Sequence, residues 1–486
     1  MKKIKLSELL ALSGVEALLT ADTEICGIAE SSRAVKKGEL FACVKGFKSD
    51  GHDYAKEAVK KGAAALLCER PAADAPAAVV KDSAAALKKI TEFFYRDGRK
   101  KAKITGVTGT KGKTTVTYLI DAVFAEKYRR PCAVIGTLKY RIGRKEYSAA
   151  NTTPSNLQIN RLIAEAVEKG MERVVMEASS HALHQGRLDN IELESAVITN
   201  VTRDHLDYHK THAAYLAAKL MIIGRIKKGG VLAVNRDMKD YAAVIKAAKK
   251  RADIKIRDFS TRTKAFLRAK IKMSGLGGTH FELVHGGKSV NVFSKLAGEH
   301  NVYNVLAAAA VCAPETGIHA VQRAVHYFKG VPGRLEKVYD GAFKIFVDFA
   351  HTPDSMENIL KTLAPITKGK IITLFGCGGE RDRGKRPLMG KIAGAMSGVV
   401  VVTSDNPRSE DAEDIIKEIM KGIKKGKNIF AEPDREKAVA LAVSNAREGD
   451  AVLLLGKGAE EYQDIKGIKH PYSDKKAALK AVKGVL

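Results

Sequence analysis

The chain has 486 residues, a formal net charge of +28 and 45% hydrophobic residues. This length exceeds what a single hydrophobic core organises, and a prior of roughly 150 residues per domain predicts about three domains. The hydrophobic content excludes global disorder. No apolar stretch reaches the roughly 18 residues that cross a bilayer, so the sequence predicts no membrane span.

The six cysteines are scattered and form no Cys-x-x-Cys pair. This argues against a disulfide framework or a zinc site and favours a reducing cytoplasm. The positive charge fits nucleic acid, anionic small substrates or a lysine-rich surface. Because the lysines come as dispersed doublets without interleaved aromatic residues, and no nucleic-acid-binding signature stands out, we expect a solvated basic surface and no nucleic-acid partner.

The first block of the chain comprises residues 1–98. Its start, residues 1–19, is basic and then apolar like a signal peptide, but Glu8 and Glu16 interrupt it and no small-residue cleavage site follows. We therefore expect a helix there. Short strands and a helix follow, and the charged run 92–103 marks the end of a small N-terminal α/β domain.

The second block, residues 99–330, alternates between strand-like and helix-like patterns, which predicts a mostly parallel sheet with helices on its faces. Within it, residues 262–296 have short alternating runs and Gly-Gly turns, which indicate an antiparallel insert before a pair of helices. The expected strands are 103–109, 131–138, 172–178 and 195–201; the expected helices are 114–127, 157–169, 296–313 and 319–328.

Turn residues at 331–336 mark the second boundary, and a new strand–helix alternation follows in residues 331–486. This pattern predicts a second nucleotide-binding-like α/β unit. Its expected strands are 344–350, 370–376, 398–405, 428–432 and 450–456; its expected helices include 414–425 and 436–446.

Residues 106–115, GVTGTKGKTT, lie between an apolar strand and an amphipathic helix. Glycines without a Cβ let backbone N–H groups close around phosphate oxygens at the positive end of a helix. Lys113 would reach the terminal phosphates and the Thr114 hydroxyl would bind Mg²⁺. Val107 replaces the first glycine of the common P-loop, and an ordinary tight turn is the alternative. The strand–loop–helix context favours ATP binding.

A polar cluster follows the strand 172–178, where ligand sites of parallel sheets lie. A serine beside a histidine is found in hydrolases, but neighbouring residues seldom face each other and no G-x-S-x-G turn is present. We interpret Glu177 as a Mg²⁺ ligand, direct or through water. Helix capping is the alternative for one of the two serines, Ser179 and Ser180.

The next strand end carries Asp204, His205, Asp207 and His209. They could form a metal site, or a capped helix start with solvated histidines. We favour the solvated alternative for His209 and a functional role for His205. Lys219 lies on a helix with apolar neighbours, where a lone lysine usually extends to solvent.

In the last block, residues 375–390, 403–411 and 456–463 follow strands and would face one crevice. Arg381 and Arg408 are candidates for gripping a carboxylate with two hydrogen bonds. A surface salt bridge is the alternative for three other cations, Arg383, Lys385 and Arg386.

Taken in order, these strings resemble the Mur ligases, and among them the branch that adds meso-diaminopimelate. The matching strings are GVTGTKGKTT, NTTPS, MEASSHAL, TNVTRDHLDYH, LAGEHNVYN, GVPGRLE, VDFAHTPDS, FGCGGERDRGKRPLMG, TSDNPRSED and GKGAEEYQ, with a weaker N-terminal match over residues 31–52. The resemblance implies an α/β protein of three domains. Residues 1–98 would bind the UDP end, 99–330 would be a P-loop ATPase, and 331–486 would be a Rossmann-like domain for the amino acid.

The resemblance also implies the reaction. ATP, with Mg²⁺, would phosphorylate the D-glutamate carboxylate of UDP-N-acetylmuramoyl-L-alanyl-D-glutamate, and the amine of meso-diaminopimelate would displace phosphate from the acyl phosphate. Such an enzyme serves peptidoglycan synthesis in the cytoplasm, and we expect a monomer. The alternatives are the same reaction with L-lysine or another diamino acid, a related ligase such as folylpolyglutamate synthetase, and a nucleic-acid-stimulated P-loop ATPase.

The resemblance assigns roles to residues by position. The ATP-binding residues would be Gly109, Thr110, Lys111, Gly112, Lys113, Thr114, Thr115, Asn301, Arg334, Asp348 and His351. The catalytic residues would be Lys113, Glu177, His205 and Lys219, and the metal ligands Thr114, Glu177, His205 and Lys219, with Lys219 carbamylated to N6-carboxylysine. The muramoyl-dipeptide contacts would be Ser32, Asn151, Thr152, Thr153, Ser179, Gln185 and Arg187. The diaminopimelate pocket would comprise Arg381, Asp405, Asn406, Pro407, Arg408, Gly456 and Glu460.

The string Asp-Asn-Pro-Arg is the family's mark for meso-diaminopimelate. Lysine lacks the second carboxylate and would leave an arginine unpaired, which is how a site rejects an analogue. The chain also departs from the family. Lys111 stands where the family usually has Asn, Ala459 replaces a usual His, Ser31 replaces a usual Asp, and Phe47 and Lys48 are unusual.

Overall fold

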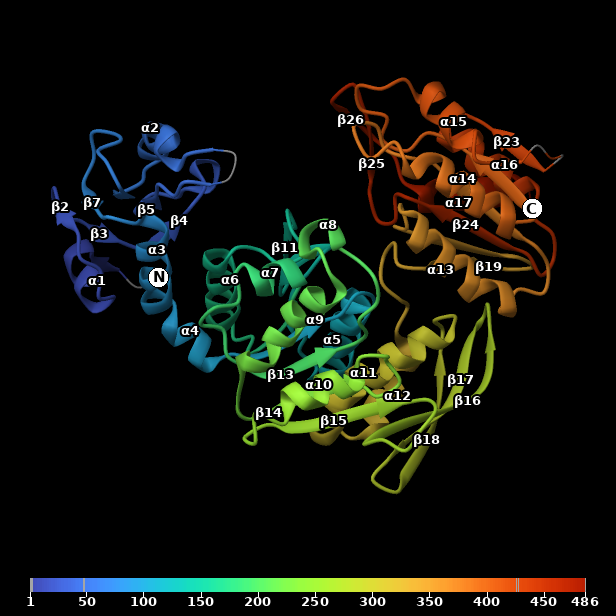
Figure 1. The fold of residues 1–486 in the computed structure, drawn as a ribbon, viewed down its shortest axis with the longest axis horizontal. Helices are drawn as coiled ribbons and strands as arrows, with labels where there is room; N and C mark the ends of the chain where they lie inside the picture. Colours follow the sequence, from blue (N-terminus) through green and yellow to red (C-terminus); the bar gives the residue numbers. More distant parts are fainter. Residues whose placement is uncertain (1–2, 47–48, 425, 427, 486) are drawn as a thin grey trace. The chain divides into compact units, whose positions relative to one another are not determined.

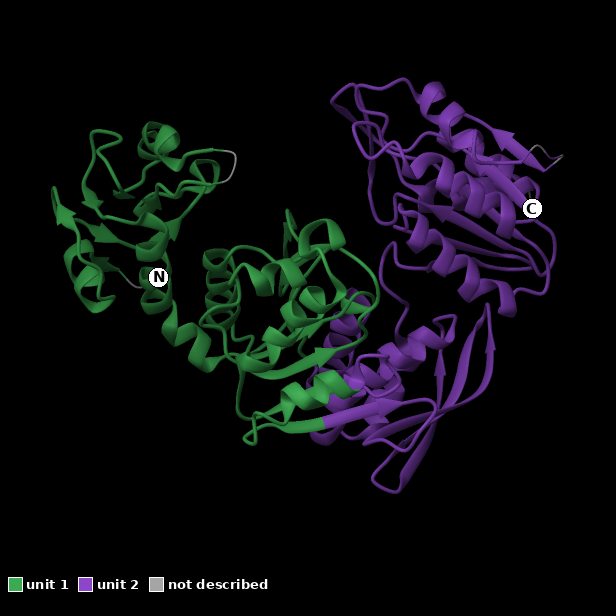
Figure 2. Ribbon diagram, in the orientation of Figure 1, with its two compact units in different colours: residues 1–113, 130–233, 242–256 green, residues 114–129, 234–241, 257–486 purple. Residues whose placement is uncertain are grey.

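The computed structural model describes residues 3–46, 49–424, 426 and 428–485, so Phe47 and Lys48 lie outside the described residues. The chain divides into two compact units (Figure 2). The first comprises residues 1–113, 130–233 and 242–256, and the second 114–129, 234–241 and 257–486. The three domain ranges inferred from the sequence stay a prediction. Among the described residues, none of the helices combines the length and apolar character needed to cross a membrane.

The N-terminal part of the first unit is a small sheet in the order β2-β7-β6-β5-β4 (Figure 1). The strands β4 to β7 pair in parallel and are almost wholly buried, as expected for short apolar runs covered on both faces. The strands are β1 (Ile4–Lys5), β2 (Leu18–Leu19), β3 (Glu24–Ile25), β4 (Gly27–Ala29), β5 (Glu39–Ala42), β6 (Ala65–Cys68) and β7 (Ala77–Val79); the helices are α1 (Leu6–Leu12), α2 (Ala55–Lys60), α3 (Ser83–Phe94) and α4 (Arg96–Lys101).

The single helix expected over residues 1–19 is wrong. The helix α1 ends at Leu12, and Gly14 adopts a φ of +61°, which a helix does not allow. Leu18 and Leu19 instead form β2, which pairs antiparallel with β7. The apolar pattern continues through the segment, but the backbone turns within it.

The larger sheet of the first unit is mostly parallel, as predicted. Within this unit the strand order is β11-β10-β9-β12-β8-β13-β14, which is part of an 11-stranded order that continues β15-β16-β17-β18. β8 lies between β12 and β13 and pairs in parallel with both, while β10 and β11 form an antiparallel edge. The strands are β8 (Lys103–Thr108), β9 (Ala133–Ile135), β10 (Lys139–Ile142), β11 (Lys145–Ser148), β12 (Arg173–Glu177), β13 (Leu193–Ile198) and β14 (Ile226–Asn235); the helices are α6 (Asn156–Glu168), α7 (Ser180–His184), α8 (Leu206–His209), α9 (His212–Leu220) and α10 (Tyr241–Ala248). The helix α5 (Lys113–Tyr128) begins at the last residue of the segment 1–113 and otherwise belongs to the second unit.

The second unit contains the predicted antiparallel insert. β16 pairs with β17 and β17 with β18, both antiparallel, and the Gly-containing turns between them are short. The elements are β15 (Lys255–Ser260), β16 (Leu267–Gly275), β17 (Gly278–His285), β18 (Lys288–Ser294), α11 (Glu299–Thr316) and α12 (Ile318–Tyr327).

The C-terminal part of the second unit is the predicted α/β layer structure, with strand order β19-β20-β24-β21-β22-β23 and only β19 antiparallel. One apolar core packs α13, α14 and α15 against the sheet, and a second packs α16 and α17 (Figure 1). The elements are β19 (Glu336–Asp340), β20 (Lys344–Asp348), α13 (Pro353–Leu363), β21 (Ile371–Phe375), α14 (Lys385–Met396), β22 (Val399–Val402), α15 (Ala412–Met420), β23 (Ile429–Ala431), α16 (Arg435–Ser444), β24 (Ala451–Leu455), β25 (Tyr462–Ile465), β26 (Ile468–Pro471) and α17 (Asp474–Val485).

Candidate active site

The glycine-rich loop leaves β8 and enters α5, as the sequence predicted. Gly109 and Gly112 have φ values of +147° and +84°, which favour glycine. A Cβ on Gly109 would lie 1.9 Å from the Thr199 hydroxyl oxygen, so the loop and the end of β13 are in close contact. The backbone oxygen of Asn200 accepts from the Thr110 N–H at 2.9 Å, and its side-chain oxygen accepts from the Lys111 N–H at 3.0 Å. Thr199 and Asn200 therefore shape the loop.

Lys113, one of two lysines in the loop, forms hydrogen bonds to the backbone of the loop itself. Its Nζ donates to the backbone oxygens of Gly109 and Thr110, each at 3.0 Å. Thr114 follows it directly and is buried in the first turn of α5. Lys111, in contrast, is exposed, and its carbonyl accepts from Thr199 at 2.7 Å. The shape of the loop thus depends on the backbone of Lys111 and leaves its side chain at the surface.

Lys219 does not extend to solvent, contrary to the usual behaviour of a lone lysine. It is only 1% exposed, and its Nζ lies 4.3 Å from the centre of the Tyr215 ring, one turn earlier on α9. The Tyr215 hydroxyl lies 3.1 Å from the Thr110 hydroxyl, which joins this helix to the phosphate loop. Burial lowers the pKa of the Lys219 amine well below its ordinary value, and the positive charge of Lys113 lowers it further.

Glu177 ends β12 with no exposed surface, as expected for a carboxylate aimed into the sheet edge. Its two oxygens accept from the backbone N–H of Thr137 at 2.9 Å and from the Thr137 hydroxyl at 3.0 Å. A Cβ on Gly136 would lie 2.4 Å from the same carboxylate, so a larger residue there would displace it. Carboxylate oxygens are also the ligands that Mg²⁺ prefers, so this residue type suits a cation site.

Histidines line the neighbouring helix starts, and the solvated state expected for His209 is wrong. His209 is 6% exposed, and its Nε2 lies 3.0 Å from the Ser180 hydroxyl. His205 adopts a left-handed φ of +52°, and its ring centre lies 6.1 Å from that of Tyr215. Asp204, His205, Asp207 and His209 do not form a metal site of their own, since no cluster of three or more His, Cys, Asp and Glu suited to a metal occurs in the described part of the chain.

The residues assigned to the muramoyl dipeptide form a hydrogen-bonded group near Glu177. Thr153 is buried and donates to the Glu177 carbonyl at 2.7 Å. Ser179 caps α7 by accepting from the Ala182 N–H at 3.2 Å, so the capping alternative applies to it. The remaining contacts are Arg187 to the Thr153 carbonyl at 2.8 Å, Arg187 to Gln185 at 2.7 Å, Thr137 to Thr152 at 3.1 Å and Tyr140 to the Asn151 carbonyl at 2.7 Å.

Ser32 lies apart from that group in a short turn of the N-terminal sheet. It is 6% exposed, and its hydroxyl donates to Glu57 at 2.8 Å. Two residues before it, Glu30 accepts a hydrogen bond from Ser155, which caps α6. The Ser32 segment is thereby joined to the strand-end group of the same unit.

In the second unit, the residues assigned to adenosine and phosphate fall into two places. Asp348 ends β20 and accepts from the N–H groups of Leu335 and Ala350 at 2.6 and 2.7 Å. Burial raises the pKa of its carboxyl, and the charge of Arg334 and the two backbone hydrogen bonds offset part of this rise. Asn301 lies instead in the first turn of α11; its Nδ2 donates to Ala297 at 2.8 Å and its Oδ1 accepts from Asn304 at 2.9 Å.

The residues assigned to the amino acid converge at the ends of β21, β22 and β24. Asn406 donates to Glu460 at 3.0 Å, and Gly456, at φ +109°, leaves room for Asp405, which a Cβ would approach to 3.5 Å. Arg408 adopts a left-handed φ of +53° and donates to the Gly379 carbonyl at 2.5 Å. A Cβ on the adjacent Gly378 would meet both Arg408 and Arg381, and Pro407 accepts from the Glu410 N–H at 3.0 Å.

Comparison with known proteins places these clusters in a family. Family models of the Mur ligase catalytic domain, the Mur ligase middle domain and the Mur ligase glutamate ligase domain match residues 24–95, 107–312 and 333–458. UDP-N-acetylmuramoyl-L-alanyl-D-glutamate--2,6-diaminopimelate ligase from Geobacillus kaustophilus is 41% identical over 473 residues, 95% of each chain. The chain belongs to the Mur ligase family.

Two further relatives agree with this assignment. The protein of the same name from Aquifex aeolicus is 40% identical over 458 residues, 92% of each chain. A solved structure of UDP-N-acetylmuramoyl-L-alanyl-D-glutamate--2,6-diaminopimelate ligase is 32% identical, covers 98% of both chains and gives a TM-score of 0.69. The Mur ligase resemblance inferred from the sequence is thus confirmed, and so is its α/β fold.

The sequence did not predict that several cationic side chains of this Mur ligase are buried. Arg386 is fully buried and binds Glu410 and Glu418, each at 2.9 Å, so a surface salt bridge is wrong for it. Arg383 does pair with Glu418 at the surface. Lys457 is fully buried beside the amino-acid cluster. The sequence places Lys457 in the string GKGAEEYQ, which follows a predicted strand and could have drawn attention to it. A lysine in such a loop is ordinarily exposed to solvent, so its burial was not expected.

A second buried pair lies behind the same cluster. Arg435 binds Asp474 with two hydrogen bonds of 2.7 Å, and both side chains have no exposed surface. The same guanidinium donates to the carbonyls of Ser404 and Leu455, which follow β22 and end β24, at 3.1 and 3.0 Å. This pair therefore ties together two of the strand ends that carry the amino-acid residues.

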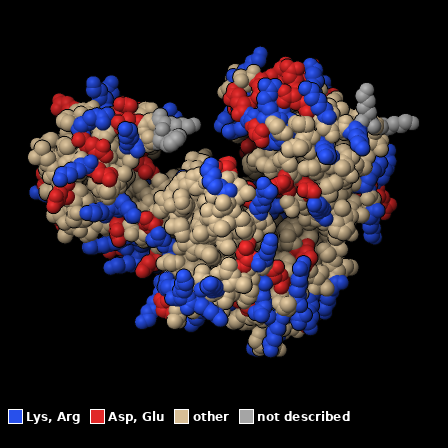
Figure 3. Space-filling model, in the orientation of Figure 1, with Lys and Arg blue, Asp and Glu red and all other residues tan. Residues whose placement is uncertain are grey.

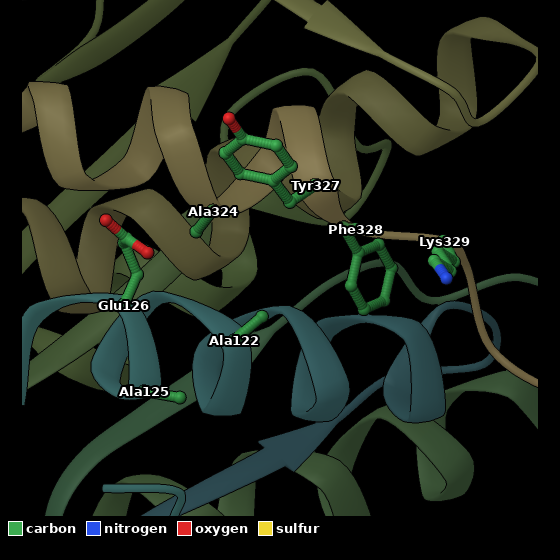
Figure 4. Close-up of a pocket in the computed structure, with 7 residues that line it drawn as sticks. All are labelled: Ala122, Ala125, Glu126, Ala324, Tyr327, Phe328 and Lys329. Carbon is green, nitrogen blue, oxygen red and sulfur yellow. The ribbon is translucent and has the colours of Figure 1, made fainter. Parts of the chain in front are cut away.

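One hollow of the Mur ligase is lined by none of the residues assigned to a ligand. A shallow, largely apolar hollow of about 350 Å³ lies on the second unit, beside α5 and the end of α12 (Figure 4). Its lining comprises Ala122, Ala125, Glu126, Ala324, Tyr327, Phe328 and Lys329. On the face shown in Figure 3, Lys and Arg side chains are interspersed with acidic and uncharged ones, which fits a dispersed basic surface.

Proposed function

We propose that this Mur ligase is an ATP-dependent acid–amino-acid ligase that joins meso-diaminopimelate to UDP-N-acetylmuramoyl-L-alanyl-D-glutamate in peptidoglycan precursor synthesis. The observation that carries the proposal is the cluster at the ends of β21, β22 and β24, which combines two arginines with carboxylates. Meso-diaminopimelate has two carboxylates and two amino groups, and this charge pattern complements it. The names of the relatives at 41% and 40% identity support the same substrate pair.

The first unit would prepare the acyl group. Backbone N–H groups of the loop and the Lys113 ammonium would hold the ATP phosphates and neutralise charge as the γ-phosphoryl group moves to the D-glutamate carboxylate. ADP leaves, and the amine of the amino acid then attacks the acyl carbon, gives up a proton and expels phosphate. The enzyme would have to bring two anions together, the ATP phosphates and the D-glutamate carboxylate. Lys and Arg side chains would do this by binding them, without forming a covalent bond.

The residues near the loop fit Mg²⁺ on chemical grounds. Mg²⁺ prefers oxygen ligands, and the buried Glu177 carboxylate supplies two oxygens. An amine is a poor ligand for this cation, whereas a carbamate on Lys219 would supply oxygens. Burial favours the neutral amine of Lys219, the form that reacts with carbon dioxide. When bound, Mg²⁺ would neutralise phosphate charge; Thr114, Glu177, His205 and carbamylated Lys219 are the residues proposed to hold it.

We also propose that the enzyme works in the cytoplasm as a monomer. The six cysteines, all in the described part of the chain, occur as thiols and not as disulfides, which fits a reducing compartment.

Phosphate release by the wild-type enzyme tests the substrate assignment. With UDP-N-acetylmuramoyl-L-alanyl-D-glutamate and ATP present, we expect kcat/KM for meso-diaminopimelate to exceed that for L-lysine by about a hundredfold or more, because lysine leaves an arginine of the pocket without its carboxylate. A higher kcat/KM for L-lysine would overturn the assignment. DNA and RNA serve as controls, since stimulation by either would favour a nucleic-acid-dependent ATPase.

Lys111→Asn introduces the residue that the family usually has at this position. It tests whether the lysine changes the KM for ATP. Because the side chain is exposed and the hydrogen bonds of this residue to Asn200 and Thr199 come from its backbone, we expect normal folding and a KM for ATP that rises about two- to fivefold, with the difference fading at high salt. Steady-state kinetics at two ionic strengths measure this. A change in kcat larger than the change in KM would show that Lys111 takes part in phosphoryl transfer.

A further inference from the structure

Lys457 is an unusual lysine because it is fully buried in a glycine-flanked turn after β24. Its Nζ donates to the Asn406 side-chain oxygen and to the Tyr462 carbonyl, both at 2.9 Å. Carboxylate oxygens of Asp405 and Glu460 lie 3.3 and 3.7 Å from the same nitrogen. A buried ammonium is costly unless it is paired and hydrogen-bonded, and these four oxygens meet that need.

The contacts of Asn406 fix which way its amide points. The amide oxygen faces two groups that only donate, the Lys457 ammonium and the Asp464 N–H, both at 2.9 Å. The amide nitrogen faces Glu460, which accepts at 3.0 Å. The reverse orientation would set donor against donor and oxygen against oxygen, so only one orientation satisfies these neighbours. The nitrogen carries two hydrogens, and Glu460 takes one of them.

We propose that Lys457 is a positioning residue that holds the Asn406 amide with its N–H toward the amino-acid pocket, where the second hydrogen binds a carboxylate of the incoming amino acid. This inference rests on the proposed function of the cluster as an amino-acid site. Lys457 itself does not touch the amino acid. Without its ammonium the amide would lose its strongest constraint, and a turned amide would present oxygen to the carboxylate.

Lys457→Met tests the inference because it keeps the length and apolar stem of the side chain and removes the donor. We expect KM for the amino acid to rise at least about tenfold, as for loss of a hydrogen bond to a charged group. KM for ATP should stay within about twofold, and kcat should fall less than KM rises. Lys476→Met, a matched change at an exposed lysine of α17, should leave all constants unchanged. A fall in kcat alone would overturn the inference.

A double-mutant cycle tests whether the effect passes through Asn406. In an Asn406→Ala background, Lys457→Met should change KM for the amino acid by less than about twofold, since the group that it orients is gone. Effects of the two substitutions that multiply would show that Lys457 acts by another route.

A crystal structure of the wild-type enzyme with bound amino acid decides the matter even if Lys457→Met fails to fold. We expect Asn406 Nδ2 within about 3.2 Å of a ligand carboxylate oxygen, with Lys457 still on the amide oxygen. An amide oxygen turned to the ligand would refute the role. The amino acid used is the one that binds the wild type most tightly by calorimetry, because meso-diaminopimelate and L-lysine both carry a carboxylate. If the enzyme binds L-lysine more tightly than meso-diaminopimelate, the proposed substrate is wrong. The structure with bound lysine still tests whether the Asn406 amide nitrogen contacts a ligand carboxylate.

Discussion

Lys219→Ala is expected to lower kcat by about a hundredfold or more at saturating substrates, because it removes the group proposed to carry the metal-binding carbamate beside the phosphate loop. The residue is almost fully buried, and Tyr215 links its helix to Thr110 of the loop, so the effect should fall on phosphoryl transfer. Phosphate release measures kcat, and added short-chain carboxylic acids should restore part of it by supplying the missing oxygens.

The matched control for this variant is Lys246→Ala, which removes an exposed lysine on α10 and should leave kcat unchanged. Thermal unfolding of both variants checks that Lys219→Ala is folded. Near-normal turnover of Lys219→Ala without added acids would refute the carbamate role. A folded, inactive variant that no short acid rescues would point to a structural need for the lysine stem.

Asp474→Asn is expected to destabilise the C-terminal sheet by about 3–5 kcal/mol, because it leaves the buried Arg435 guanidinium without its counter-charge. The substitution keeps the size of the side chain, so loss of packing contributes little. Because the protein has more than one compact unit, a single unfolding free energy is not well defined. Hydrogen exchange of the amides of β22 and β24 measures the loss locally.

Asp414→Asn supplies the comparison. It breaks an ion pair with Lys417 in which both side chains are about two-thirds exposed, at 66% and 69%, and should change stability by less than about 1 kcal/mol. If Asp474→Asn were equally mild, the buried pair would not hold the strand ends. If exchange rose everywhere equally, the pair would stabilise the unit as a whole.

The regular elements were predictable from apolar periodicity where the pattern was long. The expected strand 103–109 corresponds to β8 and the expected helix 157–169 to α6, each within one residue at either end. The bounds of other elements differ more, as for the expected strand 131–138, of which only Ala133–Ile135 forms β9. The segment 1–19 was predicted wrongly, because its apolar pattern continued past Gly14. The pairing of Leu18 with Val79 decides that structure, and such a distant contact leaves no local mark in the sequence.

The rule that ligand sites lie where parallel strands end predicted Glu177 and the segment 403–411, which contains Asp405. Asp348 was predicted only from the family resemblance. The state of His209 was not predictable, since its burial depends on Ser180, 29 residues earlier. Lys457 and Arg435 were missed for the same reason. From sequence alone, a cation in a polar loop or at a helix start is expected to be exposed. In the folded chain, acidic side chains and carbonyl groups from distant segments bury it.

The Arg435–Asp474 pair also has a consequence for the order of events during synthesis. Asp474 lies in the first turn of α17, which follows in sequence the two strand ends that the pair joins, at Ser404 and Leu455. Chains are made from the N-terminus, and early parts fold first. The nucleotide loop can therefore form before α17 is made, but the amino-acid pocket gains the Arg435–Asp474 pair only after α17 has left the ribosome.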